Sequence, residues 1–198
     1  MMGDRGAHTL DPIVTALQLR SPSSVEATVC GMTEEVHPLS SIVTFKFPSS
    51  RDGKPVRLTW YEGTRPPCPD ELDGGQHLPA EGGAIFKGSK GKLVCGVYGD
   101  SPRLLPESQM KVLKQISKTI PRVPQGNHQQ DWVRAIKNGE KAGADFAYSG
   151  PLSETCLLGN VAKRVDARIQ WDPEKMQVSN LPAANQYIRE TYRQGWSL

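Results

Sequence analysis

The sequence has 198 residues, of which 37% are hydrophobic and 23% charged, with 19 glycines and 16 prolines. This composition excludes a disordered chain, and the lack of any apolar run of about 18 residues excludes a membrane-spanning helix. The 24 basic and 21 acidic residues give a net charge of +3 and are interspersed, so neither nucleic acid nor a membrane surface is expected as a partner. No apolar signal stretch follows the first Met, which predicts a cytoplasmic protein.

The first third of the chain predicts one helix and three strands. Apolar residues at three- and four-residue spacing within 9–19 predict a helix with one apolar face. Alternating apolar and polar residues predict strands over 25–30, 41–47 and 55–61, the last two joined by a long turn. Residues 63–81 hold four prolines and a glycine pair, and we expect them to form a loop.

The rest of the chain predicts a second hairpin followed mainly by helices. The hairpin has strands at 84–87 and 92–98 around a turn bounded by Gly88 and Gly91. Capping, turn and apolar signals then predict four helices and a short strand. In chain order these are a helix from Pro106 to Ile116, a helix between Asn127 and Gly139, a helix from Pro151 to Val165, the strand 168–171 and a helix capped by Asn180.

Strands in the middle of the chain and helices toward both ends predict an α+β fold. The expected architecture is a largely antiparallel open sheet covered by helices, in one domain, with 121–124 as the best candidate boundary. Ile42, Val94 and Tyr98 alternate with the main apolar face and predict a second one. A twofold partner or further helices would have to cover that face.

The densest polar group is Asp4, His8 and Asp11. Spacings of four and three residues place all three on one face if the segment is helical. A histidine beside a carboxylate can be held in one tautomer for acid–base work, so His8 and Asp4 are candidate catalytic residues and Asp11 a candidate substrate-binding residue. Two other interpretations stay open. In one, Asp4 caps the helix, His8 is a partly buried polar residue and Asp11 faces water. The other is a metal site of two Asp and one His.

Other polar and aromatic residues carry weaker signals. The four cysteines lack C-x-x-C or C-x-x-H spacing, which predicts buried thiols and no zinc site. The turn Gly88–Gly91 precedes a strand, and no G-x-G-x-x-G occurs, so neither a phosphate loop nor a dinucleotide fingerprint is predicted. His37, His77 and His128 lie in or beside loops and are expected to be structural or solvated. The four tryptophans are expected mostly in the core.

Six segments spread over the whole chain share their order and spacing with a known family. They are Gly3–Asp11, Ile85–Leu93, Trp132–Gly139, Tyr148–Glu154, Leu158–Ala162 and Asn180–Tyr187. In these segments the chain resembles the C-terminal domain of the glucose–fructose oxidoreductase and inositol dehydrogenase (Gfo/Idh/MocA) family. It is most similar to the bacterial branch of NAD-dependent, sugar-type dehydrogenases.

The resemblance implies a two-domain enzyme of which residues 1–198 match only the C-terminal domain, for substrate binding and oligomerisation. The NAD(P)-binding Rossmann domain, with its Gly-rich loop and the family's catalytic Lys, would lie outside this sequence. Asp4 and His8 match the family's D-x-x-x-H stretch. This implies that His8 takes the proton of a sugar-like alcohol, that Asp4 orients His8 and that NAD(P) takes the hydride. The chain alone is therefore expected to bind no cofactor and not to turn over.

Two functions stay open at this point. The first is the substrate-binding and oligomerisation domain of an NAD(P)-dependent sugar or polyol oxidoreductase, as a fragment or from a start placed too late, because Met2 falls inside a motif. The second is a free-standing, non-catalytic carbohydrate-binding or dimerisation module. A sugar-like ligand and a homo-oligomer formed through the sheet face are the expected partners. Some relatives are exported, so export of a longer form stays open beside the cytoplasmic prediction.

Overall fold

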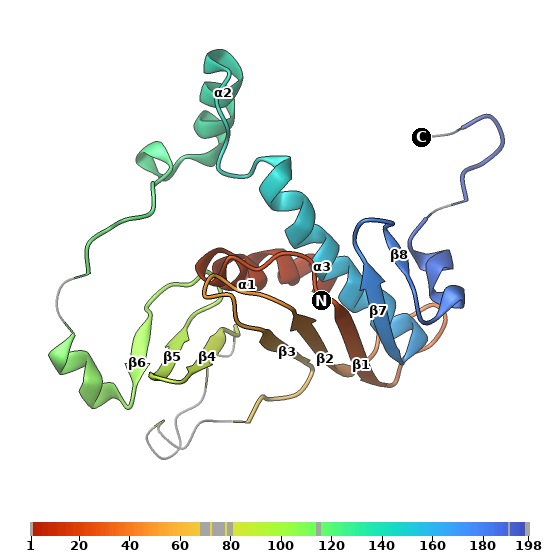
Figure 1. The fold of residues 1–198 in the computed structure, drawn as a ribbon, viewed down its shortest axis with the longest axis horizontal. Helices are drawn as coiled ribbons and strands as arrows, with labels where there is room; N and C mark the ends of the chain where they lie inside the picture. Colours follow the sequence, from red (N-terminus) through yellow and green to blue (C-terminus); the bar gives the residue numbers. More distant parts are fainter. Residues whose placement is uncertain are drawn as a thin grey trace.

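The computed structural model has an α+β architecture, with two antiparallel sheets and three α-helices among the residues that it describes (Figure 1). These residues are 2–67, 72, 78, 81–113, 116–189 and 191–196. In spatial order, the larger sheet consists of β3 (Val56–Glu62), β2 (Ser40–Phe47), β1 (Ser24–Cys30), β7 (Arg168–Asp172) and β8 (Gln177–Val178). The smaller sheet consists of β4 (Ala84–Gly88), β5 (Gly91–Cys95) and β6 (Arg103–Leu105), in that order. Every neighbouring pair of strands is antiparallel, which confirms the predicted fold class.

The larger sheet forms where the sequence alternates between apolar and polar residues. In β2, Val43, Phe45 and Phe47 are buried while Lys46 faces solvent. Phe45 lies opposite Val25 of β1 in the register, so the apolar side chains of neighbouring strands share one face. The four predicted strands of this sheet are confirmed to within one residue at each end.

Two helices, α1 (Met2–Leu17) and α3 (Phe146–Val165), pack against each other and cover the apolar face of this sheet (Figure 1). Both helices begin earlier than predicted. The apolar positions of α1 continue from Leu10 back to Met2, which is fully buried. In α3 the carboxylate of Asp145 accepts the N–H of Ala147, so this cap starts the helix before Pro151.

The two helices approach each other closely at glycines. A Cβ atom added to Gly6 of α1 would lie 3.0 Å from the Sγ atom of Cys156 in α3. A Cβ atom on Gly159 of α3 would collide with the sulfur of Met2. The first turns of α1 therefore dock on α3 only because both positions lack a side chain.

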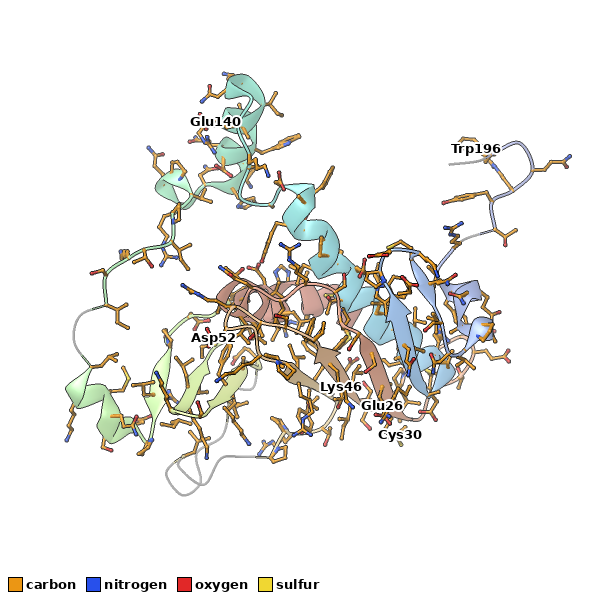
Figure 2. The ribbon with its side chains drawn as sticks, in the orientation of Figure 1. Glu26, Cys30, Lys46, Asp52, Glu140 and Trp196 are labelled. Carbon is orange, nitrogen blue, oxygen red and sulfur yellow. The ribbon has the colours of Figure 1, made fainter. Side chains whose placement is uncertain are left out.

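The opposite face of the larger sheet is mainly polar, and Ile42 is 40% exposed on it. The predicted grouping of Ile42 with Val94 and Tyr98 on one sheet face is wrong, because Val94 is buried in the smaller sheet and Tyr98 lies in a turn. The outward positions of the first three strands include Glu26, Thr28, Cys30, Thr44, Lys46, Arg57, Thr59 and Tyr61, of which Glu26, Cys30 and Lys46 are labelled in Figure 2.

The smaller sheet, β4 (Ala84–Gly88), β5 (Gly91–Cys95) and β6 (Arg103–Leu105), has a small core of its own. The predicted hairpin turn between Gly88 and Gly91 is confirmed. The second strand of this hairpin ends at Cys95 and not at Tyr98 as predicted. A tight turn ends it, in which the N–H of Gly96 donates to the carbonyl of Asp100 at 2.9 Å.

A long excursion joins β6 to α3 through η1 (Glu107–Val112), η2 (Pro124–Gly126) and α2 (His128–Asn138). Figure 1 shows α2 standing away from both sheets. Its predicted limits are confirmed, since the Asn127 side chain accepts the N–H of Gln130 and Gly139 adopts the left-handed conformation. The preceding helix, predicted to reach Ile116, ends at Val112.

Several burial predictions fail on this excursion and at the C-terminus. Trp132 is 64% exposed because α2 has no core against which to pack, and Trp196 is exposed as well. Trp171 is buried and Trp60 half-buried, as expected of core tryptophans. The cysteine prediction holds for Cys95 and Cys156 and is wrong for Cys30, which lies on the solvent face of β1. Cys68 and His77 lie outside the described residues.

The predicted last helix is replaced by the 3-10 helix η3 (Pro182–Tyr187). Asn180 does not cap it. The Asn180 side chain accepts the N–H of Gln170 at 2.6 Å and donates to the carbonyl of Arg168 at 2.9 Å. The Asn180 side chain thus attaches this part of the chain to β7. This tertiary contact takes up the side chain that the sequence pattern had assigned to a helix cap.

Candidate functional site

A polar stripe runs along the exposed side of α1. Because the helix begins at Met2, Asp4, His8, Asp11 and Thr15 follow one another at spacings of four, three and four residues on one face. The buried positions of α1, Met2, Gly6, Leu10 and Val14, form the other face. The structure therefore brings the three predicted site residues together on one surface, and we call these four residues the α1 stripe.

Asp4 and His8 are both exposed and lie one helical turn apart. Within the described part of the chain, neither forms a hydrogen bond or an ion pair, so the contact by which Asp4 would orient His8 is not made here. The neighbour of His8 is Tyr98. Their ring centroids are 5.6 Å apart and the rings are inclined by 71°, an edge-to-face arrangement. Catalysis by Asp4 and His8 stays a prediction.

Tyr98 reaches α1 from the turn that follows β5. Its backbone N–H donates to the carboxylate of Asp100 at 3.3 Å, which holds the turn in shape. Gly99, the next residue, has a φ of +72° and lies so near α1 that an added Cβ would be 2.9 Å from the Cβ of Pro12. The turn thus packs directly on α1 and carries Tyr98 to the α1 stripe.

Tyr148 of α3 reaches the other end of the α1 stripe. Its hydroxyl donates to the carboxylate of Asp11 and lies 2.8 Å from the hydroxyl oxygen of Thr15. Burial and the hydrogen bond to the Asp11 carboxylate raise the pKa of Tyr148 to about 12, although Thr15 acts in the opposite direction. The Tyr148 hydroxyl therefore keeps its proton at neutral pH and fixes one oxygen of Asp11.

The chemistry of this surface suits a polyhydroxylated ligand. The neutral imidazole of His8 can accept a proton from a hydroxyl group, and the carboxylates of Asp4 and Asp11 can accept hydrogen bonds from neighbouring hydroxyls. An aromatic ring beside such groups offers an apolar surface to the C–H groups of the same ligand. The arrangement thus combines a proton acceptor with hydrogen-bond acceptors and an aromatic contact.

The described residues do not fit a dinucleotide. Such a cofactor places its pyrophosphate at the N-terminus of a helix that follows a parallel strand. Both sheets here are antiparallel, so no described helix follows a parallel strand of a sheet. Among the described residues, no three His, Cys, Asp or Glu side chains come together as metal ligands. No described helix is long and apolar enough to cross a membrane.

Sequence patterns did not identify Tyr98, Tyr148 or Thr15 as site residues. Tyr98 was expected on a sheet face, and Tyr148 lies 137 residues from its partner Asp11 along the chain. The continuation of the α1 periodicity to Thr15 was the one local signal that could have added a residue to the stripe. His37 and His128 are exposed and lie away from α1 in the chain, as expected of solvated residues.

A buried ion pair joins β3 to α3 and takes no part in this site. The Nζ atom of Lys163, which is 2% exposed, lies 2.6 Å from Oε2 of Glu62. The indole N–H of Trp60 donates to the same oxygen at 3.1 Å. Burial alone would raise the pKa of Glu62, but the hydrogen bond and charge of Lys163, together with Trp60, hold it below its ordinary value.

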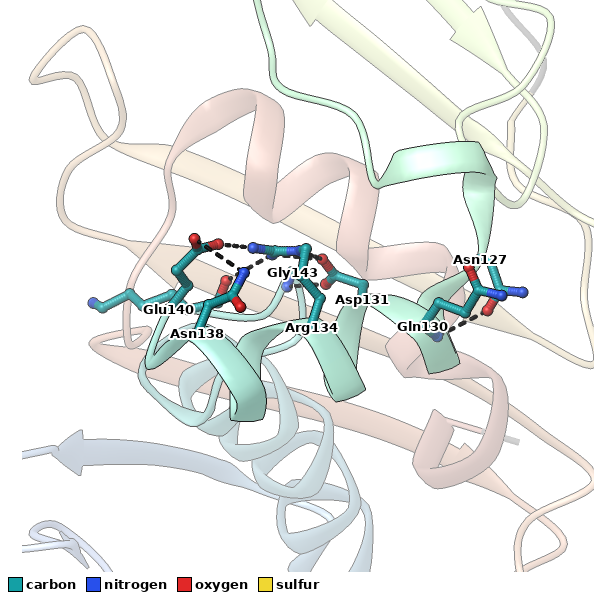
Figure 3. A network of polar contacts seen from close by, with 8 residues as sticks. Asn127, Gln130, Asp131, Arg134, Asn138, Glu140 and Gly143 are labelled. Carbon is teal, nitrogen blue, oxygen red and sulfur yellow. Dashed lines mark hydrogen bonds and ion pairs between the residues drawn. The ribbon is translucent and has the colours of Figure 1, made fainter.

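A second polar network fastens the end of α2 to the segment that follows it (Figure 3). The carboxylate of Asp131 accepts the backbone N–H of Gly143 at 2.8 Å and a guanidinium N–H of Arg134 at 2.8 Å. Arg134 also pairs with Glu140. The Gly143 hydrogen bond and Arg134 hold the pKa of Asp131 below its ordinary value. The network gives α2 a fixed end although the helix stands outside the core.

Comparisons with known proteins leave the family open. No protein-family model matches the sequence, and no curated protein matches it significantly. Among solved structures, the chain is similar to a "putative dehydrogenase" from Bordetella bronchiseptica RB50, with a TM-score of 0.45 and 14% identity over 84% of this chain and 54% of that one. It is also similar to a "putative oxidoreductase" from Thermotoga maritima, with a TM-score of 0.39 and 15% identity over 83% of this chain and 45% of that one.

The chain spans about half the length of both proteins. TM-scores below one half and identities near 15% decide neither the activity nor the family of this chain.

Proposed function

We propose that this chain is the substrate-binding and oligomerisation domain of an NAD(P)-dependent sugar or polyol oxidoreductase of the Gfo/Idh/MocA type. The observation that carries the proposal is the α1 stripe, where Asp4 and His8 of the D-x-x-x-H stretch lie exposed on one helix face with Asp11. The resemblance of six segments in the sequence and the open antiparallel sheet support it as well.

In this function the residues of the chain bind the alcohol and move one proton. A hydroxyl of the ligand donates to the imidazole of His8, which takes the proton as that carbon is oxidised. Asp4 and Asp11 accept hydrogen bonds from the neighbouring hydroxyls and set the orientation of the ring or chain. The oxidation also needs a hydride acceptor, and since these residues do not fit NAD(P), a cofactor domain of another segment or chain has to supply it.

A second copy of the chain is the protein partner in this proposal. The outer face of the larger sheet carries Thr28, Ile42 and Thr44 and is covered by neither of the helices that pack on the sheet. A sheet face that carries such short side chains between charged ones can pair with itself about a twofold axis.

Calorimetric titration of the chain with myo-inositol tests the ligand-binding part of the proposal. We expect binding by the unaltered chain, a loss of at least about tenfold in affinity for His8→Asn, and no effect of His128→Asn, which alters an exposed histidine on α2. The chain alone is expected not to reduce NAD. Absence of polyol binding would overturn the proposal, and NAD reduction by the chain alone would refute the need for a cofactor domain.

The alternative is a free-standing, non-catalytic carbohydrate-binding or dimerisation module. The lack of a contact between Asp4 and His8 favours it, because a binding residue needs no oriented imidazole. The intact mass of the protein in its source cells separates the two functions. A mass near 21.7 kDa supports the module, whereas a mass larger by about 100–200 residues supports the oxidoreductase.

A further inference from the structure

The exposed ring of Tyr98 is the feature of the site that the proposed function leaves unexplained. Its side chain is 69% exposed, although its ring and the ring of His8 lie edge-to-face with their centroids 5.6 Å apart. An aromatic ring this exposed buries little apolar surface and contributes little to the core. The hydroxyl of Tyr98 forms no hydrogen bond within the described part of the chain, in contrast to that of Tyr148.

The backbone around Tyr98 is fixed without any help from its side chain. The N–H of Tyr98 is held by Asp100, the N–H of Gly99 donates to the carbonyl of Gly96 at 3.1 Å, and Gly99 lies against Pro12. Any residue at position 98 would therefore be carried to the same place beside His8. The turn presents the tyrosine ring to solvent at the α1 stripe, and the ring is not needed to build the turn.

A ring at this place complements the polar groups of the stripe. The equatorial hydroxyls of a cyclic polyol or pyranose point outward from its rim, while axial C–H bonds on one side of the ring form an apolar face. Such a face can pack on the face of an aromatic ring while the rim reaches His8 and the carboxylates. An open-chain polyol has the same hydroxyl groups but no rigid C–H face, and it loses more rotational freedom when it binds.

We propose that Tyr98 is a ligand-binding residue of the α1 stripe, whose ring packs on the C–H face of a cyclic polyol or sugar and so selects ring-shaped over open-chain ligands. The proposal rests on the proposed function, because it takes His8 and the carboxylates as the groups that meet the ligand's hydroxyls. It adds a specificity-determining residue that the D-x-x-x-H stretch does not contain.

The test compares myo-inositol with sorbitol, which carries the same number of hydroxyl groups on an open chain. Binding is measured by NMR titration of the chain, of His8→Asn and of three further variants. For Tyr98→Leu we expect myo-inositol to bind about three- to tenfold more weakly and sorbitol to be unaffected. Tyr98→Phe should keep the preference, because the ring and not the hydroxyl makes the contact. Tyr187→Leu, at an exposed tyrosine of η3, is the matched control.

The outcomes separate this proposal from the proposed function. If His8→Asn weakens myo-inositol binding and Tyr98→Leu does not, the role of Tyr98 is refuted and the proposed function stands. If Tyr98→Leu weakens both probes equally, selection of ring-shaped ligands is refuted. If the unaltered chain binds neither probe, both proposals fail. Urea unfolding of Tyr98→Leu must match that of the unaltered chain, as its exposure predicts.

Discussion

Tyr148 connects two helices through a single hydroxyl group. It donates to Asp11 and contacts Thr15, both on α1, from the first turns of α3. Replacing Tyr148 by Phe removes both contacts and leaves a carboxylate oxygen without its donor. We expect Tyr148→Phe to lower the free energy of unfolding by about 1–3 kcal/mol, as measured by urea titration.

The same hydroxyl gives the protein a pH dependence in the alkaline range. The pKa of Tyr148 is about 12 in the folded chain, above its ordinary value near 10. Between these values the folded chain keeps a proton that the unfolded chain has lost, so stability falls as the pH rises through that interval. The fall should be smaller in Tyr148→Phe than in the unaltered chain. Equal slopes for the two proteins in urea titrations at several pH values would contradict the assignment.

Among the elements, β3 and α3 are joined by the pair of Glu62 and Lys163. Lys163→Met removes the lysine ammonium group from the buried Glu62 carboxylate and should cost about 3–5 kcal/mol. The double variant Glu62→Leu with Lys163→Met should recover much of this loss, because no charge is then left buried. Lys175→Met, at a lysine that is 70% exposed, is the control and should change little. A small effect of Lys163→Met would show that water reaches Glu62.

The stability of the fold at acid pH is expected to depend on the same ion pair. Because the folded chain holds the pKa of Glu62 below its ordinary value, the pair stabilises the fold above that value and loses this effect as the pH falls through the lowered one. The double variant should therefore lose less stability than the unaltered chain as the pH falls. Thermal unfolding between pH 3 and 6, expressed as a difference between the two proteins, measures it.

The network at the end of α2 is expected to act locally. Asp131→Ala removes the acceptor for the Gly143 N–H and for Arg134 (Figure 3), and α2 stands away from both sheets (Figure 1). Amide hydrogen exchange over 128–145 should accelerate by about tenfold or more while exchange in β1 and β2 stays unchanged. Lys137→Ala, at an exposed position of the same helix, is the control. Equal acceleration in the sheet would show that α2 supports the whole fold.

For the whole molecule, the outer face of the larger sheet is where we propose that a second copy of the chain pairs. In a twofold pair, a residue near the axis meets its own copy, so Ile42→Glu brings like charges together. We expect sedimentation equilibrium to show a dimer whose dissociation constant rises at least about tenfold in Ile42→Glu. Ile136→Glu changes an exposed isoleucine on α2 and should leave the dimer intact. A strict monomer at millimolar concentration would contradict pairing through this face.

Sequence patterns predicted the elements whose conformation depends on residues close together in the sequence. The strands of the larger sheet follow from alternation, and both ends of α2 follow from Asn127 and Gly139. Elements that depend on distant partners were missed. Asn180 carried a capping signal but binds β7, and the early start of α1 depends on Gly159 of α3 giving room to Met2. The tryptophan of α2 was expected in a core that the excursion never reaches.

The candidate site was predictable only in part for the same reason. Asp4, His8 and Asp11 lie on one helix, so their spacing alone could group them. Tyr98 and Tyr148 arrive from a turn of the smaller sheet and from α3, and no spacing rule connects them to α1. Their positions beside α1 follow from packing, which a single sequence does not contain.

The close docking of α1 on α3 buries a cysteine whose reactivity can report whether the two helices are in contact. Cys156 lies under Gly6, and burial raises the pKa of its thiol to about 11. Thiolates react with alkylating reagents and buried thiols do not. With Cys30, Cys68 and Cys95 replaced by serine, labelling of Cys156 would therefore follow the fraction of molecules in which α1 has lifted from α3. Any ligand that binds the exposed side of α1 and holds the helix down would slow that labelling, so a reaction on the hidden side of the helix can measure occupancy of its open side.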